Sequence, residues 1–168
     1  CHSDISCMEG AWGGYLPAVY GHEASGEVSG IGDNIKDLSI GDRVVVTLIR
    51  SCGDCINCKQ GQPTLCLTEY DGTDGPLKTL NGDKLMQAMA CGAFAEKVVV
   101  DKSQVVKVNK TISYETAALM ACGVITGIGA VVNAAKIKPG QDVVVIGAGG
   151  VGLNAIQGAR LAGARRII

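Results

Sequence analysis

The chain has few aromatic residues, few histidines and almost no net charge, and these scarcities exclude several classes of function. It contains one Phe, one Trp and two His among 168 residues, and 15 basic residues stand against 16 acidic ones. A net charge of −1 without a basic run argues against a nucleic-acid or membrane partner held by bulk electrostatics. The unbroken apolar stretches, such as residues 44–46 and 143–146, are too short to span a bilayer. The sequence therefore predicts a soluble, cytoplasmic protein.

Both ends of the chain have the character of cuts within a longer protein. The chain opens at Cys1 without an initiator Met and closes on Ile167 and Ile168, which resemble the beginning of a strand. We therefore expect truncation at both ends, with any targeting segment lying outside this sequence. We also expect the isolated fragment to be inactive.

Cysteine, in contrast, is abundant, and half of the eight cysteines lie in one short run. Cys52, Cys55, Cys58 and Cys66 form the pattern Cys-x2-Cys-x2-Cys-x7-Cys. Four thiolates at this spacing are typical of a tetrahedral zinc site without an open position, so the metal would hold a loop in shape. The alternative is a pair of disulfides in a secreted scaffold, but a chain with 47% apolar residues can build a core without them. The run predicts a structural zinc.

The pattern of apolar residues changes along the chain from β to alternating β and α. Strand signals lie at residues 27–28, 43–47, 94–100 and 105–108, which predicts a barrel-like β domain. Ser113 stands at a helix N-cap position, and the pattern predicts one helix ending near residues 122–123 and a second over 126–135. Residues 141–146 are then predicted to form a buried strand of a parallel sheet, followed by a helix through Gly163.

A glycine-rich turn joins that strand to that helix. Residues 147–152, Gly-Ala-Gly-Gly-Val-Gly, match G-x-G-x-x-G, in which glycines permit a tight turn and close approach of a pyrophosphate to a helix N-terminus. A glycine-rich βα turn without a ligand is the alternative. The predicted cofactor-binding residues of this turn are Gly147, Gly149, Gly150, Val151 and Gly152. The acid that separates NAD from NADP lies about 20 residues on, at or beyond the end of the chain.

A second set of metal-binding residues is scattered along the sequence. Cys1, His22 and Cys122 would make a three-ligand catalytic zinc site with a fourth position open, although nothing in their spacing alone makes them neighbours. A lone histidine is more often structural. Cys7 and Cys91 compete as ligands but have no flanking pattern, so we expect each to be a buried free thiol.

Taken together, the motifs resemble the zinc-dependent alcohol dehydrogenases of the medium-chain dehydrogenase/reductase superfamily, over essentially the whole chain. They follow family order: Cys-His-Ser-Asp at 1–4, Gly-His-Glu at 21–23, the four-cysteine loop, Gly-Ala-Phe-Ala-Glu at 92–96, Cys-Gly-Val-Ile-Thr-Gly at 122–127 and the glycine turn. The resemblance implies an α/β fold, with a truncated GroES-like β barrel domain at residues 1–115 and the start of a Rossmann dinucleotide-binding domain at residues 116–168. It also implies a homo-oligomer.

The resemblance assigns roles around a catalytic zinc. Cys1, His22 and Cys122 correspond to its ligands, and Glu23 corresponds to the carboxylate behind the metal. Asp4 corresponds to the residue that fixes the His22 tautomer and raises its basicity. Zinc of this kind acts as a Lewis acid on an alcohol or aldehyde oxygen. The implied cofactors are therefore two Zn²⁺ ions per chain and NAD, with NADP as the alternative.

The implied reaction is transfer of a hydride between a zinc-bound primary alcohol, or the aldehyde, and a nicotinamide cofactor. Ser3 corresponds to the hydroxyl that takes the alcohol proton, and His2 lies near the cofactor pyrophosphate. Many members end the proton relay with a histidine where this chain has Ser6, which is no base at pH 7. We expect the proton to leave through water or the ribose.

Substrate choice follows from three positions. Trp12 and Leu48 correspond to walls of the substrate pocket, and members with Trp there favour small alcohols. The glutathione-dependent formaldehyde branch, an S-(hydroxymethyl)glutathione dehydrogenase, has an acidic residue at the Trp12 position and Arg at the Tyr70 position. That branch stays an alternative. A second alternative is a zinc-stabilised reductase without catalytic zinc, but such members lack the Cys1, His22 and Cys122 set. A third is a zinc-stabilised, non-catalytic binding module, and the neutral charge and the glycine turn argue against that module.

Overall fold

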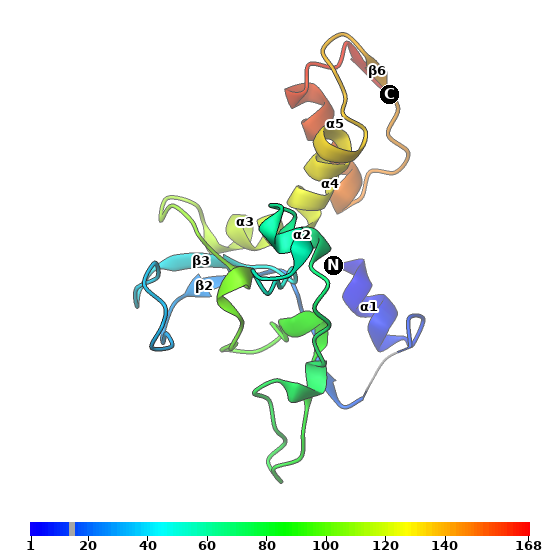
Figure 1. Ribbon diagram of the computed structural model, residues 1–168. Coiled ribbons are helices and arrows are strands. Elements are labelled where there is room, and N and C mark those ends of the chain that lie inside the picture. Colours follow the sequence, from blue (N-terminus) through cyan, green and yellow to red (C-terminus); the bar gives the residue numbers. More distant parts are fainter. Residues whose placement is uncertain (14–15) are drawn as a thin grey trace. The chain divides into compact units, whose positions relative to one another are not determined.

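The computed structural model describes residues 1–13 and 16–168, which form two compact units, Cys1–Ala121 and Cys122–Ile168 (Figure 1). The first unit contains short strands, turns and brief helices. The second contains helical segments and a pair of parallel strands.

The main sheet of the first unit is antiparallel and has three strands. In spatial order these are β2 (Ala24–Glu27), β3 (Arg43–Val46) and β5 (Val105–Lys107). The central strand β3 has three consecutive valines, all buried, as expected for a strand covered on both faces. Val45 packs with Ala117 and Ala121 to form a small core, so the sheet is held against the helix that follows it.

The predicted barrel is not closed among the described residues. Residues 94–100, predicted to be a strand, form bends and irregular backbone, and Val99 is 64% exposed. A barrel closes only when each edge strand pairs with a neighbour. Because 94–100 makes no strand pairing in the described part of the chain, β2 and β5 remain the edges of an open sheet. The other three strand predictions agree with β2, β3 and β5 to within a few residues.

Short elements around this sheet position most of the candidate site residues. They are α1 (His2–Met8), β1 (Ala18–Val19), α2 (Ile56–Lys59), η1 (Pro63–Leu65), η2 (Gly72–Asp74), β4 (Met86–Gln87), η3 (Ala88–Ala90) and η4 (Lys102–Gln104). Strand β1 pairs in parallel with β4. Helix α1 was not predicted, because its apolar residues Ile5 and Met8 are 50% and 63% exposed and leave no buried stripe in the sequence pattern.

The helical region begins as predicted but does not end where predicted. The Ser113 side chain accepts a hydrogen bond from Thr116 N at 3.3 Å, which confirms the N-cap of α3 (Tyr114–Leu119). Instead of a break near residue 122, the π-helical segment η5 (Met120–Val124) leads into α4 (Ile125–Gly129) and a second π segment, η6 (Ala130–Ala134). A π turn shifts the backbone hydrogen bonds, and the Thr47 hydroxyl donates to the Ala121 carbonyl at 3.0 Å. This tertiary contact could not be read from the local sequence.

The helical residues Tyr114–Ala134 form a longer apolar segment than any unbroken apolar run of the sequence. Their 21 residues are long and apolar enough to cross a membrane, by length and composition alone. Isolated polar residues divide this helix into short apolar runs, so its length was not visible in the sequence pattern. A single helix of this kind does not indicate a membrane protein.

The second unit contains a βαβ motif. Strands β6 (Asp142–Val143) and β7 (Arg166–Ile167) are parallel and are joined through α5 (Gly150–Leu161). The hydrogen bond from Val145 N to Ile168 O, at 2.8 Å, extends the pairing beyond β6. Helix α5 packs so closely on α4 that a Cβ on Gly127 would come within 2.5 Å of Val151 O. The strand predicted over 141–146 is thus present but shorter.

Candidate functional site

The four cysteines of the loop at 52–66 come together around one point. Their sulfurs lie within 4.8 Å of one another, and the Cys52–Cys58 and Cys55–Cys66 sulfur pairs are each 4.0 Å apart. Tetrahedral coordination with Zn–S bonds of about 2.3 Å places sulfurs about 3.8 Å apart. A disulfide would need about 2.05 Å, and all eight cysteines are free in the described chain. The geometry therefore fits a zinc ion and does not fit the disulfide alternative.

Hydrogen bonds from this loop favour a thiolate at Cys52 but not at Cys58. Cys52 Sγ accepts N–H hydrogen bonds from Asp54 at 3.4 Å and Cys55 at 3.3 Å. A hydrogen bond from the Thr68 side chain, followed by these N–H groups, lowers the pKa of Cys52 to about 6. Burial and the neighbouring Cys55 thiol raise the pKa of Cys58 to about 12. Four thiolates this close repel one another unless a cation lies between them, and a bound metal ion would neutralise that repulsion.

A buried aspartate–histidine pair forms a second centre in the first unit. His22 and Asp4 are 1% and 2% exposed, and His22 Nδ1 lies 3.0 Å from Asp4 Oδ2. This is ion-pair distance, although Nδ1 has no aligned hydrogen-bond partner among the described residues. The other carboxylate oxygen, Asp4 Oδ1, accepts the Gly21 N–H at 2.9 Å. The sequence places these residues 17 or more positions apart, and the fold brings them together.

Gly21 has to be glycine in this arrangement. Its φ is +95°, and a Cβ there would come within 2.6 Å of Phe94 N. Ala93 N and Phe94 N donate to the Gly21 and Tyr20 carbonyls at 2.9 and 2.8 Å, so this turn is clamped against the segment at 93–94. The clamp sets the position of His22, the next residue.

The charge of Asp4 is stabilised despite its burial. Burial acts to raise the pKa of Asp4, but the Gly21 N–H and the neighbouring His22 ring outweigh it, and the pKa lies below its usual value. An ionised carboxylate beside Nδ1 holds that nitrogen as the N–H and leaves Nε2 as the lone-pair donor. The pair therefore has the chemistry of a metal ligand with its supporting carboxylate.

Other predicted ligand and proton-transfer residues belong to the N-terminal segment and to the position after His22. Cys1 Sγ lies within 4.8 Å of a His22 ring nitrogen, and Ser3 Oγ lies 3.6 Å from Cys1 Sγ. On the same helix, α1, His2 Nδ1 lies 3.3 Å from Ser6 Oγ. Glu23 follows His22 and is half-buried.

Cys122 belongs to the second unit, where its sulfur lies 3.9 Å from Thr126 Oγ1. Its role as the third ligand therefore stays a prediction.

The two cysteines expected to be inert differ in their surroundings. Cys91 is completely buried, donates its S–H to Thr47 O at 3.3 Å and accepts from Gln104 Nε2 at 3.6 Å. Burial, with a contribution from the Asp4 charge, raises the pKa of Cys91 to about 12, so it stays a thiol. This confirms the prediction for Cys91, whereas Cys7 is only half-buried.

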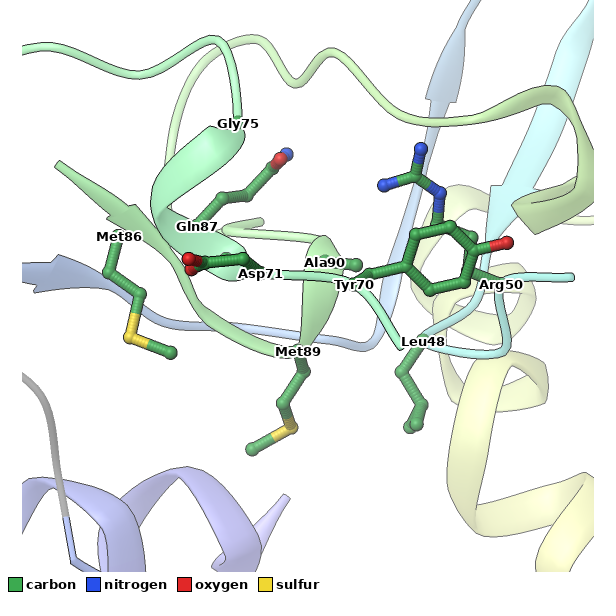
Figure 2. Close-up of a pocket in the computed structure, with 10 residues that line it drawn as sticks. Leu48, Arg50, Tyr70, Asp71, Gly75, Met86, Gln87, Met89 and Ala90 are labelled. Atoms are coloured by element: carbon green, nitrogen blue, oxygen red, sulfur yellow. The ribbon is translucent and has the colours of Figure 1, made fainter. Parts of the chain in front are cut away.

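The two predicted substrate-pocket residues lie in different surroundings. Leu48 lines a pocket of about 250 Å³ together with Tyr70 and Met89 (Figure 2). Trp12, on the other hand, is 64% exposed. Sequence reasoning missed two charged residues of this pocket, Arg50 and Asp71. The guanidinium carbon of Arg50 lies 4.0 Å from the centre of the Tyr70 ring. Twenty positions separate Arg50 and Tyr70, so no local pattern could have revealed the contact.

The glycine turn of the second unit has the backbone that its motif requires. Gly147 has a φ of +102°, and Gly149 is the N-cap of α5. A Cβ on Gly152 would collide with the Gly147 carbonyl oxygen, whereas Gly150 faces open space and Val151 is 42% exposed. The free N–H groups of the first turn of α5 thus remain open to an anion.

Comparison with known proteins assigns the family. Residues 1–110 match the alcohol dehydrogenase GroES-like domain. The chain is 40% identical to an S-(hydroxymethyl)glutathione dehydrogenase of Synechocystis sp., covering all of this chain and 48% of that protein. It is 37% identical to alcohol dehydrogenase-like 7 of Arabidopsis thaliana, covering 46% of that protein.

Solved structures agree with this assignment. The chain is similar to an alcohol dehydrogenase zinc-binding domain protein from Burkholderia ambifaria, with a TM-score of 0.90 and 34% identity, over 99% of this chain and 47% of that one. It is also similar to benzyl alcohol dehydrogenase from Acinetobacter calcoaceticus, with a TM-score of 0.88, 34% identity and the same coverage. The chain belongs to the zinc-type medium-chain alcohol dehydrogenases and spans about half the length of the curated relatives it matches.

Proposed function

We propose that the protein is an oxidoreductase that transfers a hydride between a primary alcohol, or its aldehyde, and a nicotinamide cofactor. The observation that carries this proposal is the buried Asp4–His22 pair beside the Cys1 sulfur, in a chain of the alcohol dehydrogenase family. A histidine oriented by a carboxylate next to a thiol has the character of a metal ligand with its supporting residue.

We infer that Cys1, His22 and Cys122 hold a catalytic zinc, because three protein ligands leave a fourth position for the substrate oxygen. Asp4 lies beside His22 Nδ1, which leaves Nε2 as the ligand atom. Glu23 is the carboxylate behind the metal. A zinc ion held there supplies Lewis acidity to the alcohol oxygen.

Proton transfer is assigned to α1. Ser3 Oγ lies 3.6 Å from Cys1 Sγ. An alcohol oxygen held beside Cys1 would be within reach of the Ser3 hydroxyl, which would take the alcohol proton. His2 would contact the cofactor pyrophosphate. Its Nδ1 lies 3.3 Å from Ser6 Oγ, but Ser6 is no base at neutral pH. The proton therefore leaves through water or the cofactor ribose.

Residues 116–168 are the start of a Rossmann domain that follows a GroES-like domain at residues 1–115. The parallel β6–β7 pair and the tight Gly147–Gly152 turn support this assignment. Gly147, Gly149, Gly150, Val151 and Gly152 hold the cofactor pyrophosphate at the start of α5. The cofactor is NAD, with NADP as the alternative, and the enzyme is a cytoplasmic homo-oligomer. The four-cysteine loop holds a second, structural zinc.

Small primary alcohols are the proposed substrates, with Trp12 and Leu48 as pocket walls. Because the indole fills pocket volume, Trp12→Ala should shift preference toward longer or branched alcohols without a change in zinc content. Forty per cent identity to an S-(hydroxymethyl)glutathione dehydrogenase favours that adduct as the second candidate substrate. Comparing kcat/KM for ethanol, a long-chain alcohol and S-(hydroxymethyl)glutathione decides between them, and a strong preference for the adduct refutes the small-alcohol assignment.

The catalytic-zinc assignment is tested by Cys122→Ala, with Cys7→Ala as the matched control. Loss of one of three ligands should remove or weaken only the catalytic zinc, so alcohol oxidation falls by orders of magnitude while the thermal melt stays near wild type. The half-buried Cys7 belongs to neither cluster, and its variant should keep both zinc ions and activity. Retention of alcohol oxidation by Cys122→Ala would refute the assignment.

A further inference from the structure

One side-chain hydroxyl of the first unit contacts the backbone directly before a predicted zinc ligand. Thr47 follows β3, and its Oγ1 donates to the Ala121 carbonyl at 3.0 Å, across 74 positions of the chain. Ala121 is 1% exposed, and Cys122 is the next residue. The contact therefore joins the main sheet to the backbone that leads into Cys122.

The carbonyl that accepts this bond lies in an irregular turn. The π-helical segment η5 (Met120–Val124) separates α3 from α4 and contains both Ala121 and Cys122. A π turn widens the backbone hydrogen-bond spacing from four residues to five, which leaves a carbonyl accessible to a side-chain donor. Turns of this kind inside helices are frequent at functional sites. The Thr47 hydroxyl thus donates within a turn that also carries a predicted ligand.

Thr47 is itself held in place by a buried glutamine, Gln104, which is 1% exposed. The Thr47 N–H donates to the Gln104 carbonyl at 2.9 Å. The Thr47 carbonyl accepts from Gln104 Nε2 at 2.9 Å and from Cys91 Sγ at 3.3 Å. A side chain branched at Cβ also has few rotamers. The Thr47 hydroxyl is therefore a donor with a fixed position.

The same network reaches the backbone before His22. Gln104 Nε2 also donates to the Ala90 carbonyl at 3.1 Å. Three residues later, the Ala93 N–H binds the Gly21 carbonyl at 2.9 Å, and His22 follows Gly21. The network therefore links the two backbone segments that lead into predicted ligands.

We propose that Thr47 is a positioning residue for the catalytic zinc: its hydroxyl fixes the Ala121 carbonyl and thereby the direction in which Cys122 presents its sulfur. The inference rests on the proposed function, which assigns Cys122 as a ligand. Zinc takes tetrahedral ligands with Zn–S bonds of about 2.3 Å, so a small rotation of the peptide before a ligand weakens the site. Thr47 acts only through Cys122 and does not bind the metal.

Thr47→Val tests this role, because valine has nearly the shape of threonine but no hydroxyl. In the zinc-loaded full-length enzyme, the variant should hold its catalytic zinc about 10- to 100-fold less tightly in competition with a chelator, the range found when residues that orient metal ligands are replaced. The zinc of the four-cysteine loop should be unaffected. Thr47→Ser restores the hydroxyl and should return the affinity close to that of wild type.

Cobalt in place of the catalytic zinc gives a signature that a loss of stability alone does not change. A thiolate bound to Co²⁺ absorbs in the near ultraviolet through sulfur-to-metal charge transfer, and the absorption grows with the number of bound thiolates. Because the Cys122 sulfur is displaced, Thr47→Val should lose part of this absorption per cobalt ion bound at the catalytic site. Thr47→Ser should keep it.

Ser113→Ala is the matched control, because it removes another hydroxyl contact of the same helical region, the N-cap bond from Thr116 N. It should lower the melting temperature about as much as Thr47→Val does, but leave zinc affinity and cobalt absorption unchanged. Unchanged zinc affinity in Thr47→Val, no recovery in Thr47→Ser, or equal weakening in Ser113→Ala would overturn the proposal.

Zinc binding and turnover separate this proposal from the proposed function. If the wild type binds two zinc ions but oxidises no alcohol, the proposed function fails, yet zinc affinity that depends on the Thr47 hydroxyl still upholds the positioning role and its absence refutes it. If Cys122→Ala binds the catalytic zinc as tightly as wild type, Cys122 is not a ligand and the positioning role is refuted.

Discussion

At the scale of single residues, His22, a proposed metal ligand, is positioned by one other side chain and one glycine. Asp4 supplies a carboxylate 3.0 Å from His22 Nδ1, and the same carboxylate binds the Gly21 N–H at 2.9 Å. The positive φ of Gly21 permits the turn that makes both contacts. The histidine, its supporting carboxylate and the glycine therefore act as one unit.

Gly21→Ala tests this unit. The new Cβ would meet Phe94 N at 2.6 Å as well as the strain of a φ of +95°, so we expect a loss of about 2–4 kcal/mol in the free energy of unfolding. Zinc content should fall as His22 moves. Gly82→Ala is the control, because its φ is +89° but its Cβ would face open space, and it should cost only about 1 kcal/mol. Urea titration of both variants measures the difference, and equal costs would contradict the close-contact argument.

The residue scale also shows where the sequence was informative. Ser113 could be identified as an N-cap and the four cysteines as a metal loop, because both signals lie within a few positions. The stacking of Arg50 on Tyr70 could not be foreseen, since only the tertiary fold brings the two side chains together. The same holds for the 3.0 Å contact between Asp4 and His22, which the sequence supplied only through family resemblance.

At the scale of elements, we expect the four-cysteine loop to depend on a bound metal. Its only regular pieces are α2 and η1, neither longer than four residues, and no residue of either is buried. Elements this short have no core of their own to stabilise them. The sulfur cluster is therefore the main constraint on the loop.

Cys58→Ser should release that constraint. Binding of zinc by four thiolates is coupled to folding and contributes on the order of 10 kcal/mol, so the variant should be insoluble or cleaved rapidly in the loop by protease. Elemental analysis should find one zinc fewer per chain. A folded, protease-resistant Cys58→Ser protein with unchanged zinc would show that the loop metal is not structural.

The βαβ element carries an ion pair with a defined pH response. Hydrogen bonds from Arg165, then Arg166, lower the pKa of Asp142 to about 2. Because the ordinary aspartate pKa is about 3.9, the folded state binds this proton less tightly than the unfolded state. The stabilisation is therefore complete above about pH 5 and is lost as the pH falls through about 4 toward 2.

Thermal melts of wild type and Asp142→Asn from pH 6 to pH 2 test this response. The wild type should melt at a higher temperature above about pH 5, and the gap should close as the pH approaches 2. Other carboxylates titrate equally in both proteins and cancel in the comparison. A gap that stays constant down to pH 2 would mean that the Asp142 pKa is not lowered by the arginines.

Element boundaries were the least predictable part of the fold. Strands β2, β3 and β5 follow local patterns of valines and turn residues, and their sequence signals were sufficient. The segment at 94–100 has the same apolar character but no partner in the described chain, because strand formation depends on a neighbour and not on composition alone. The π turn at residues 120–124 likewise occurs where the Thr47 hydroxyl, distant in sequence, donates to the Ala121 carbonyl.

At the scale of the whole molecule, the chain belongs to the zinc-type alcohol dehydrogenases and spans about half the length of its curated relatives. It contains the residues proposed to hold both zinc ions and the first turn of the proposed cofactor site. The central claim is that these residues support direct hydride transfer from an alcohol carbon to a nicotinamide ring.

That claim is tested most directly by isotope transfer. The zinc-loaded full-length enzyme is incubated with oxidised nicotinamide cofactor and hexan-1-ol deuterated at C1, and the reduced cofactor is examined by mass spectrometry. The account predicts one deuterium on the nicotinamide ring, and none after the zinc has been removed with a chelator. Reduced cofactor without deuterium, or undiminished transfer by the zinc-free protein, would contradict it.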